Sequence, residues 1–320
     1  MELVLDLAPV LAARERIAPH VRRTPVISWS PPGGERVHLK LEQLQVGGSF
    51  KARGAFNALL TSPAGSLSRG VVTASGGNHG LGVACAARAL GAPATIFLPE
   101  KAPASTERRL VGLGSRVIRG GVAWDDAWAR AVERARATGA LLVHPFDDPA
   151  VVAGQGTIGL ELVEQVPDLD LVVVAIGGGG LVAGVASVIK ALRPGARVVG
   201  VEPVGAPSMR ESVAAGRVVR LASVKTIAGT LAPLAPSQLT LDLTAASVEE
   251  VVLVEDADML SAMRLLWDEL RILVEPAGAA ALAALVSGKA PLRGARSPVV
   301  LVCGANLDEE LAAPVIRGGP

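Results

Sequence analysis

The sequence contains no tyrosine, and phenylalanine and tryptophan contribute only four residues each, so aromatic residues make up 2% of the 320 positions. Half of the residues are nevertheless apolar, and the core must be built from alanine, valine and leucine. A chain of this length can form two cores, because a single core usually stops growing at roughly 250–300 residues. Small aliphatic side chains with so few aromatic ones favour an α/β architecture over a β-sandwich.

Cysteine is also scarce, with only Cys85 and Cys303 present. Neither belongs to a Cys-x-x-Cys pair or a Cys/His cluster, which argues against a disulfide framework and a structural zinc site. The N-terminus carries acidic residues early and lacks the basic and apolar regions of a secretory signal. These features predict a cytoplasmic protein, in which Cys85, within an alanine-rich helical stretch, lies in the core.

No excess of either charge is present, because 31 basic side chains nearly balance 30 acidic ones and no block of like charges occurs. Nucleic acid and membrane surfaces are therefore not expected as partners. The one long uncharged stretch, Leu171 to Ile189, is interrupted by Gly177–Gly180, and each glycine costs a helix interior roughly 1 kcal/mol relative to alanine. This stretch predicts a strand, a loop and a helix rather than a membrane span.

Apolar runs bounded by glycine predict strands that alternate with helices. Residues 171–176 indicate a strand buried on both faces, and a helix over 181–193 and a strand over 197–201 complete a unit typical of a parallel crossover. The other expected elements are strands at 70–74, 94–98 and 299–302 and helices at 81–90, 106–114 and 123–138. Loops with glycine or asparagine follow three of the strands, and open α/β sheets bind ligands at such carboxyl ends.

The glycine tetrad Gly177–Gly180 precedes a predicted helix, so bare backbone amides and the positive helix end converge there. This favours a phosphate site. A dinucleotide site is a rival, because Gly178-x-Gly180-x-x-Ala183 satisfies the relaxed dinucleotide pattern, with Glu202 about 20 residues further on. A nicotinamide-dependent dehydrogenase or a non-catalytic nucleotide-binding module therefore remains a remote alternative.

Two further stretches have both a structural and a functional interpretation. Ser75–Gly80 (SGGNHG) lies where a strand passes into a helix, so its amides could hold a carboxylate, although helix capping by Ser75 or Asn78 would also explain it. His79 and Cys303 are equally open to a structural role. Gly47–Gly54 (GGSFKARG) places a lysine among small and apolar residues, which suggests a close approach to another group that spacing alone does not identify.

Together, five separated stretches resemble the threonine/serine dehydratases, which belong to the fold-type II pyridoxal-phosphate enzymes. They follow in order over nearly the whole chain. The stretches are Ser49-Phe50-Lys51-x-Arg53-Gly54-Ala55, Ser75-x-Gly77-Asn78-His79-Gly80, HPFDDPAVVAGQGT at 144–157, Gly177–Gly180, and CGAN at 303–306.

The resemblance implies that pyridoxal 5'-phosphate is the cofactor and that Lys51 carries it as a Schiff base, a role that suits a desolvated lysine amine. Phe50 would lie against one face of the ring, Asn78 would bond the ring hydroxyl, and Cys303 would face the ring nitrogen. The phosphate would rest on Gly177, Gly178, Gly179 and Gly180. The implied substrate-binding residues are Ser75, Gly76, Gly77, Asn78, His79 and Gln155.

The implied fold is a two-lobed α/β architecture like that of the tryptophan synthase β subunit, with parallel sheets covered by helices. The larger, cofactor-binding lobe is expected to comprise 1–53 plus 147–320, and the smaller lobe 54–146 is expected to carry the substrate-carboxylate loop. A homodimer is implied by the likeness alone. Because the chain ends soon after Asn306, we expect no C-terminal regulatory domain.

The implied activity is the dehydration and deamination of a small hydroxy-amino acid. L-Threonine would give 2-oxobutanoate and ammonia, and L-serine would give pyruvate and ammonia. The same fold and cofactor could instead act on 3-hydroxyaspartate, an ectoine-type hydroxylated compound or another β-hydroxylated amino acid, or racemise serine weakly.

Three departures from the family pattern qualify these expectations. Gly76 stands where serine racemases carry a second catalytic serine, so racemisation should be weak. Glu202 and Ala206 match two ligands of the divalent-metal site of racemase-like members, but Ser208 replaces the Asp, which weakens a site for a hard cation. Thr226–Thr230 reads TIAGT where the family commonly has TIADG, so the preferred substrate can differ.

Overall fold

The computed structural model describes residues 6–290, 292 and 294–317. Their strands form two sheets, ordered β1-β2-β10-β7-β8-β9 and β5-β4-β3-β6. The larger sheet contains β1 (Val26–Trp29), β2 (Val37–Leu41), β7 (Leu171–Ala175), β8 (Arg197–Pro203), β9 (Glu250–Val254) and β10 (Pro298–Val302), and the smaller β3 (Val71–Ala74), β4 (Ala94–Leu98), β5 (Arg116–Arg119) and β6 (Leu141–Leu142). All pairings are parallel except that of β1 with β2. The α/β class with parallel sheets is confirmed.

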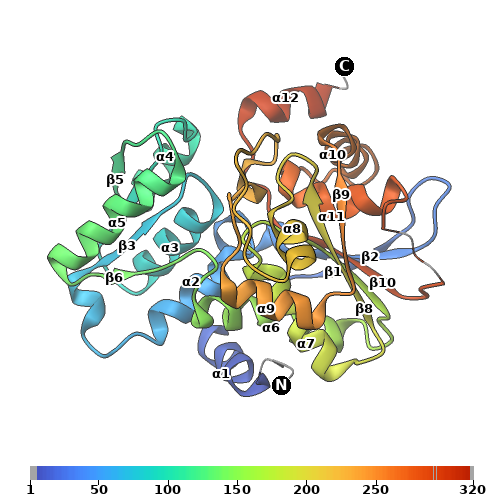
Figure 1. Cartoon of the computed structure of the whole chain (residues 1–320), viewed down its shortest axis with the longest axis horizontal. Coiled ribbons are helices and arrows are strands. Elements are labelled where there is room, and N and C mark those ends of the chain that lie inside the picture. The colour runs from blue at the N-terminus through green and yellow to red at the C-terminus, as the bar shows by residue number, and fades with distance from the viewer. Residues whose placement is uncertain (1–5, 291, 293, 318–320) are drawn as a thin grey trace.

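Helices cover both sheets and divide the molecule into two lobes (Figure 1). The smaller lobe carries α3 (Asn78–Ala89), α4 (Ala104–Gly112) and α5 (Trp124–Thr138). The larger lobe carries α1 (Leu7–Ile17), α6 (Pro149–Gln165), α7 (Gly180–Leu192), α8 (Ser208–Ala215), α9 (Gln238–Ser247), α10 (Asp256–Leu270), α11 (Pro276–Val286) and α12 (Glu309–Arg317). Between the lobes, α2 (Lys51–Leu60) packs on both α3 and α6. The exact lobe boundaries stay a prediction.

The chain passes between the lobes at residues 143–148, where β6 of the small sheet leads to α6 of the large lobe. Helix α6 begins there because the Asp148 carboxylate accepts hydrogen bonds from the amides of Ala150 and Val151, with Pro149 in the first turn. The uncharged stretch 171–189 forms β7 and most of α7, as expected. None of the helices in the described part of the chain is both long and apolar enough to span a membrane.

A cluster of buried, charged side chains holds the start of α2 in place. Arg53, 1% exposed, forms 2.7 Å ion pairs with Glu42, which precedes α2, and with Glu161 of α6. Lys40 of β2, also buried, completes the cluster with a 2.5 Å contact to Glu161. Removing one partner of such a cluster leaves a charge without its counterion and typically costs about 3–5 kcal/mol. The cluster therefore holds the first turn of α2 against the large lobe.

Glycines let α2 and α6 approach within backbone contact. A Cβ added at Gly154 of α6 would lie 2.6 Å from the Cα of Gly54 and 2.7 Å from the carbonyl oxygen of Arg53. Glycine normally weakens a helix interior, but here a larger residue would push the two helices apart. Close packing at this crossing therefore also positions the residues that open α2.

We expect Gly154→Ala to destabilise the protein by about 1–3 kcal/mol, because overpacking outweighs the gain in helix propensity. Thermal unfolding of the variant and the parent protein measures the difference. Gly112→Ala is the matched control, since a Cβ at this position in α4 meets no atom within 4 Å. The control should be neutral or stabilising, and an equally stable Gly154→Ala protein would contradict the packing account.

Candidate active site

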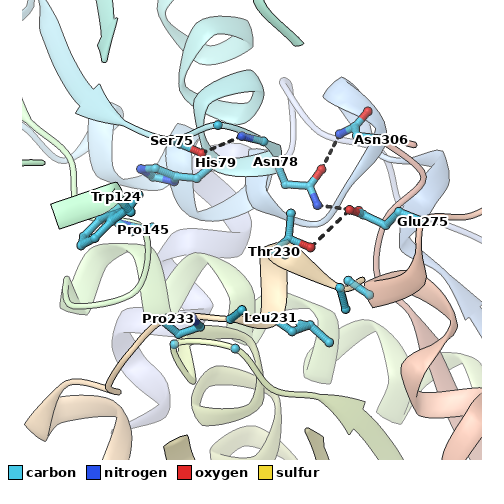
Figure 2. A pocket seen from close by; sticks show the side chains of 18 of the residues that line it. Ser75, Asn78, His79, Trp124, Pro145, Thr230, Leu231, Pro233, Glu275 and Asn306 are labelled. Atoms are coloured by element: carbon cyan, nitrogen blue, oxygen red, sulfur yellow. Dashed lines mark hydrogen bonds between the residues drawn. The ribbon is translucent and has the colours of Figure 1, made fainter. Parts of the chain in front are cut away.

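A cavity of about 630 Å³ lies between the lobes, at the carboxyl ends of β3, β7 and β10 (Figure 2). Most of the predicted site residues line it. They are Phe50, Lys51, Ser75, Gly76, Gly77, Asn78, His79, Gly177, Gly178, Gly179, Gly180 and Cys303. Residues far apart in the sequence are thus brought to one site because three parallel strands end at the same cleft.

Lys51 opens α2 and projects its amine into this cavity. Its Nζ donates a 2.7 Å hydrogen bond to the Pro145 carbonyl and lies 5.1 Å from the centroid of the Phe50 ring. Burial lowers the pKa of Lys51 to about 8. A significant fraction of the amine is therefore neutral near pH 7, which is the form that attacks carbonyls.

The tetrad Gly177–Gly180 joins β7 to the N-terminus of α7. Gly179 has a φ of 88°, which a residue with a side chain rarely adopts, and a Cβ at Gly178 would overlap the ring of Phe146. Thr240 of α9 donates a 2.8 Å hydrogen bond to the Gly178 carbonyl and so holds that peptide in place. The loop therefore presents backbone N–H groups and a helix N-terminus, the arrangement that binds phosphate.

The loop between β3 and α3 is shorter than the sequence predicted. Residues 75–80 were expected as a loop before a helix at 81, but α3 begins at Asn78. Gly77, the N-cap residue, has backbone angles outside the helical and the extended regions (φ −157°, ψ −134°), and the chain turns there directly into the first helical turn. The backbone N–H groups of the loop and of this first turn thus lie together at the N-terminus of α3. Such a cluster of donors at the positive end of a helix suits a carboxylate.

His79 is not placed to carry charge. Burial lowers its pKa well below the usual value for histidine, and its Nε2 donates to the Val143 carbonyl at 3.2 Å. Cys303 is likewise held neutral: burial raises the pKa of its thiol well above the ordinary range, and its Sγ donates to the Ala277 carbonyl at 3.3 Å. Beside a ligand, Cys303 can therefore act only as a neutral group.

Three predicted residues lie away from the cavity. Gln155 is buried between α6 and α2, where its Oε1 accepts a hydrogen bond from the Gly54 amide, so the structure does not bring it to the substrate loop. Glu202 accepts 2.8 Å hydrogen bonds from the amides of Met209 and Arg210 and so caps α8, and burial raises its pKa to about 7. Ala206 is buried.

The possible divalent-metal site at Glu202 and Ala206 stays a prediction. Both oxygens of Glu202 are engaged by backbone amides, and Ser208 provides no carboxylate. Within the described residues, no group of three or more His, Cys, Asp or Glu side chains is arranged to hold a metal ion.

The sequence analysis missed a buried carboxyl group on the cavity wall. Glu275, 4% exposed, precedes α11 and accepts hydrogen bonds from Asn78 (2.5 Å) and Thr230 (3.3 Å). Burial raises its pKa to about 7. The only sequence signal was a single acidic residue between the apolar stretch Ile272–Val274 and an alanine-rich helix opened by Pro276.

The opposite wall is apolar. Trp124 lies beside Pro145 in Figure 2 and donates from its indole N–H to the Ala74 carbonyl at 3.0 Å. The His144 ring forms edge-to-face contacts with the rings of Trp128 and Phe146, each with ring centroids 4.7 Å apart. Leu231 and Pro233 continue the apolar lining. A chain with few aromatic residues thus gathers several of them at this cavity.

Fold and site together define a class of enzyme: two parallel α/β lobes enclose a buried lysine amine, a glycine loop that leads into a helix, and the N-terminus of a second helix. The comparisons agree with this definition. The model of the family described as pyridoxal-phosphate dependent enzyme matches residues 17–304, and the chain belongs to this family.

Three similar proteins illustrate the different activities named within this family. The L-threonine ammonia-lyase of Geobacter sulfurreducens is 40% identical over 319 residues, covering 99% of this chain and 79% of that protein. The phenylserine dehydratase of Ralstonia pickettii is 41% identical over 310 residues, covering 95% and 94%. The structure of maize serine racemase matches with a TM-score of 0.92 at 35% identity, covering 98% of both chains.

Pyridoxal phosphate is the cofactor of this family, and the cavity fits it. The neutral fraction of the Lys51 amine suits its aldehyde, and the side-chain-free Gly177–Gly180 loop suits its phosphate. The Cys303 thiol, kept protonated by burial, suits an uncharged ring nitrogen. All three groups line the same cavity.

The rate at which cofactor-free protein bonds to pyridoxal phosphate should rise with pH through about 8 and level off above it. The reason is that Lys51 loses its proton at this pH, whereas an exposed lysine titrates near 10.4. Stopped-flow absorbance at several pH values measures this rate. Lys101→Ala, which removes an exposed amine from the same cavity, should leave the profile unchanged. A rate still rising steeply at pH 10 would contradict a buried, low-pKa amine.

Proposed function

We propose that this protein is an ammonia-lyase that converts L-threonine to 2-oxobutanoate and ammonia. The observation that carries the proposal is the presence, in one cavity, of the Lys51 amine, the Gly177–Gly180 loop and the Ser75–His79 loop. The similarity to an L-threonine ammonia-lyase over 99% of the chain supports it. L-Serine, which would give pyruvate and ammonia, is a second substrate of the same reaction.

Bound pyridoxal phosphate supplies an electron sink conjugated to the substrate's α-carbon. The residues of the chain bind and orient the amino acid. Backbone amides of the Ser75–His79 loop, at the start of α3, would hold the carboxylate, and Gly76 and Gly77 leave room for it. The α-hydrogen is then directed to the Lys51 amine, which in its neutral form accepts the proton at Nζ.

Loss of the β-hydroxyl as water leaves an enamine, which hydrolyses to the 2-oxo acid and ammonia. The buried Cys303 thiol donates to a backbone carbonyl and remains uncharged. It would therefore not supply a proton to the ring nitrogen of the cofactor, as a carboxylic acid would. This arrangement favours rapid elimination over a long-lived carbanion. The apolar wall around Trp124 and Leu231 limits the access of water to the reacting carbon.

Purified protein loaded with pyridoxal phosphate should release 2-oxobutanoate and ammonia in equal amounts from L-threonine. Lys51→Ala should lower kcat by at least about 10³-fold, because it removes both the cofactor attachment and the base. A coupled dehydrogenase assay follows the 2-oxo acid. Loaded protein that turns over neither L-threonine nor L-serine would rule out the proposed reaction.

A bulkier substrate is the second candidate, favoured by the apolar wall of the cavity. Trp124, Pro145 and Leu231 could contact an aromatic β-substituent, and one relative of similar identity is a phenylserine dehydratase. A substrate panel of L-threonine, L-serine, 3-hydroxyaspartate and phenylserine, compared by kcat/KM, separates these possibilities. The homodimer and the cytoplasmic location remain predictions.

Racemisation should be slower than elimination with L-serine as substrate. Gly76 provides no side chain that could deliver a proton to the face of the α-carbon opposite Lys51, and its added Cβ would lie 3.2 Å from that of Ala102. Chiral chromatography measures the rate of D-serine formation, which is compared with the rate of pyruvate release. D-Serine formed faster than pyruvate would overturn this prediction.

A further inference from the structure

A continuous chain of side-chain hydrogen bonds connects the protein surface to the cavity. Arg109 of α4 donates to the Oδ1 of Asn306, Asn306 donates to the Oδ1 of Asn78, and Asn78 donates to Glu275. The donor–acceptor distance is 2.5 Å in each of the three bonds. Figure 2 shows the last two bonds, with Thr230 as a further donor to Glu275. Arg109 and Asn78 belong to the smaller lobe and the other two to the larger lobe, so the chain crosses the cleft.

The two ends of this chain determine the direction of every bond in it. A carboxamide can reverse its donor and acceptor by a 180° flip, so neither asparagine has an orientation of its own. A guanidinium only donates, and a carboxylate only accepts. Arg109 therefore requires the oxygen of Asn306 to face it, which turns the NH₂ group of Asn306 toward the Oδ1 of Asn78. At the other end, the ionised form of Glu275 requires the NH₂ group of Asn78 to face it.

The bonds also leave one donor for a ligand. Both N–H groups of Asn306 are used, because its Nδ2 donates to the Gly47 carbonyl (2.9 Å) as well as to Asn78. The Nδ2 of Asn78 has two hydrogens, and one bond to Glu275 accounts for only one of them. Asn78 lines the cavity, so its second N–H is available there.

We propose that Arg109 and Glu275 are positioning residues, which hold the Asn78 carboxamide with one N–H directed at the ring hydroxyl of the bound cofactor. The inference rests on the proposed function and on the family resemblance, which implies that Asn78 bonds that hydroxyl. Arg109 does not line the cavity and is exposed, and its shortest contact toward the site is the bond to Asn306. It also donates a 3.5 Å hydrogen bond to the Gly47 carbonyl, and its charge favours the ionised form of Glu275 by lowering the pKa of that carboxyl. Nothing in the sequence of α4 distinguishes Arg109 from its neighbour Arg108.

The test is Arg109→Gln, which replaces an obligatory donor with a group that can face Asn306 in either orientation. With L-threonine, kcat should fall roughly three- to tenfold while KM stays about the same, because the lost interaction acts on the cofactor rather than on substrate binding. The visible absorbance band of the bound cofactor should shift as well. Arg109→Lys, which still only donates, should restore most of both properties.

Two control variants separate positioning from other effects. Arg108→Gln removes a charge from the same helix, and Ser105→Ala removes another hydrogen bond between the lobes, that of Ser105 to Asp308. Both should match the parent protein in kcat and in absorbance. If either control shows the same change as Arg109→Gln, the change comes from the charge of α4 or from weaker contact between the lobes, and the proposal fails.

Glu275→Gln tests the opposite end, since a carboxamide there no longer requires the NH₂ group of Asn78. It should shift the absorbance band in the same way. In the double variant with Arg109→Gln the losses in kcat should be less than multiplicative, because both residues act through one carboxamide. Fully multiplicative losses, or an Arg109→Gln protein that equals Arg108→Gln, would overturn the proposal.

Failure of the proposed function would be recognised separately. A parent protein that binds pyridoxal phosphate but does not convert L-threonine disproves the reaction, and the absorbance measurements still decide whether Arg109 and Glu275 position Asn78. A parent protein that does not bind the cofactor overturns both.

Discussion

Burial of one amine in the cleft between the two lobes is the constraint on which the site depends. Lys51 can be largely desolvated because α2 begins inside the molecule, and α2 begins there because Arg53, two residues later, is held by Glu42 and Glu161. Glycines at the crossing of α2 with α6 let the helix lie close enough for these ion pairs. The same contacts that stabilise the fold thus set the pKa of the reactive group.

The rest of the site combines features that are separate in the sequence but adjacent in the fold. Parallel strands β3, β7 and β10 end at one cleft, so a helix N-terminus for a carboxylate, a glycine loop for a phosphate and a neutral thiol all face the Lys51 amine. Both lobes contribute, and the polar contacts between them, from Arg109 to Asn306 and from Ser105 to Asp308, cross the edge of the cavity. The Arg109–Asn306 contact therefore links the arrangement of the lobes to the Asn78 side chain on the cavity wall.

The sequence predicted the features that depend on residues close together along the chain. The buried run 171–176 and the alternation of strands and helices predicted the parallel α/β fold, and the glycine tetrad predicted the turn between β7 and α7. Its role in phosphate binding stays a prediction. The start of α3 was missed because it depends on the backbone conformation of Gly77, which the sequence pattern does not reveal. Glu275 was missed because its partner Asn78 is 197 positions away, and a single acidic residue has no motif. Gln155 belonged to a recognised stretch, yet its side chain faces α2 rather than the cavity.

The most direct test of this account is the chemical identity of the amine that holds the cofactor. Protein loaded with pyridoxal phosphate, reduced with borohydride and digested, should give one pyridoxyl-bearing peptide, with the added mass on Lys51. A modification spread over surface lysines, or located on a single lysine other than Lys51, would contradict the central claim.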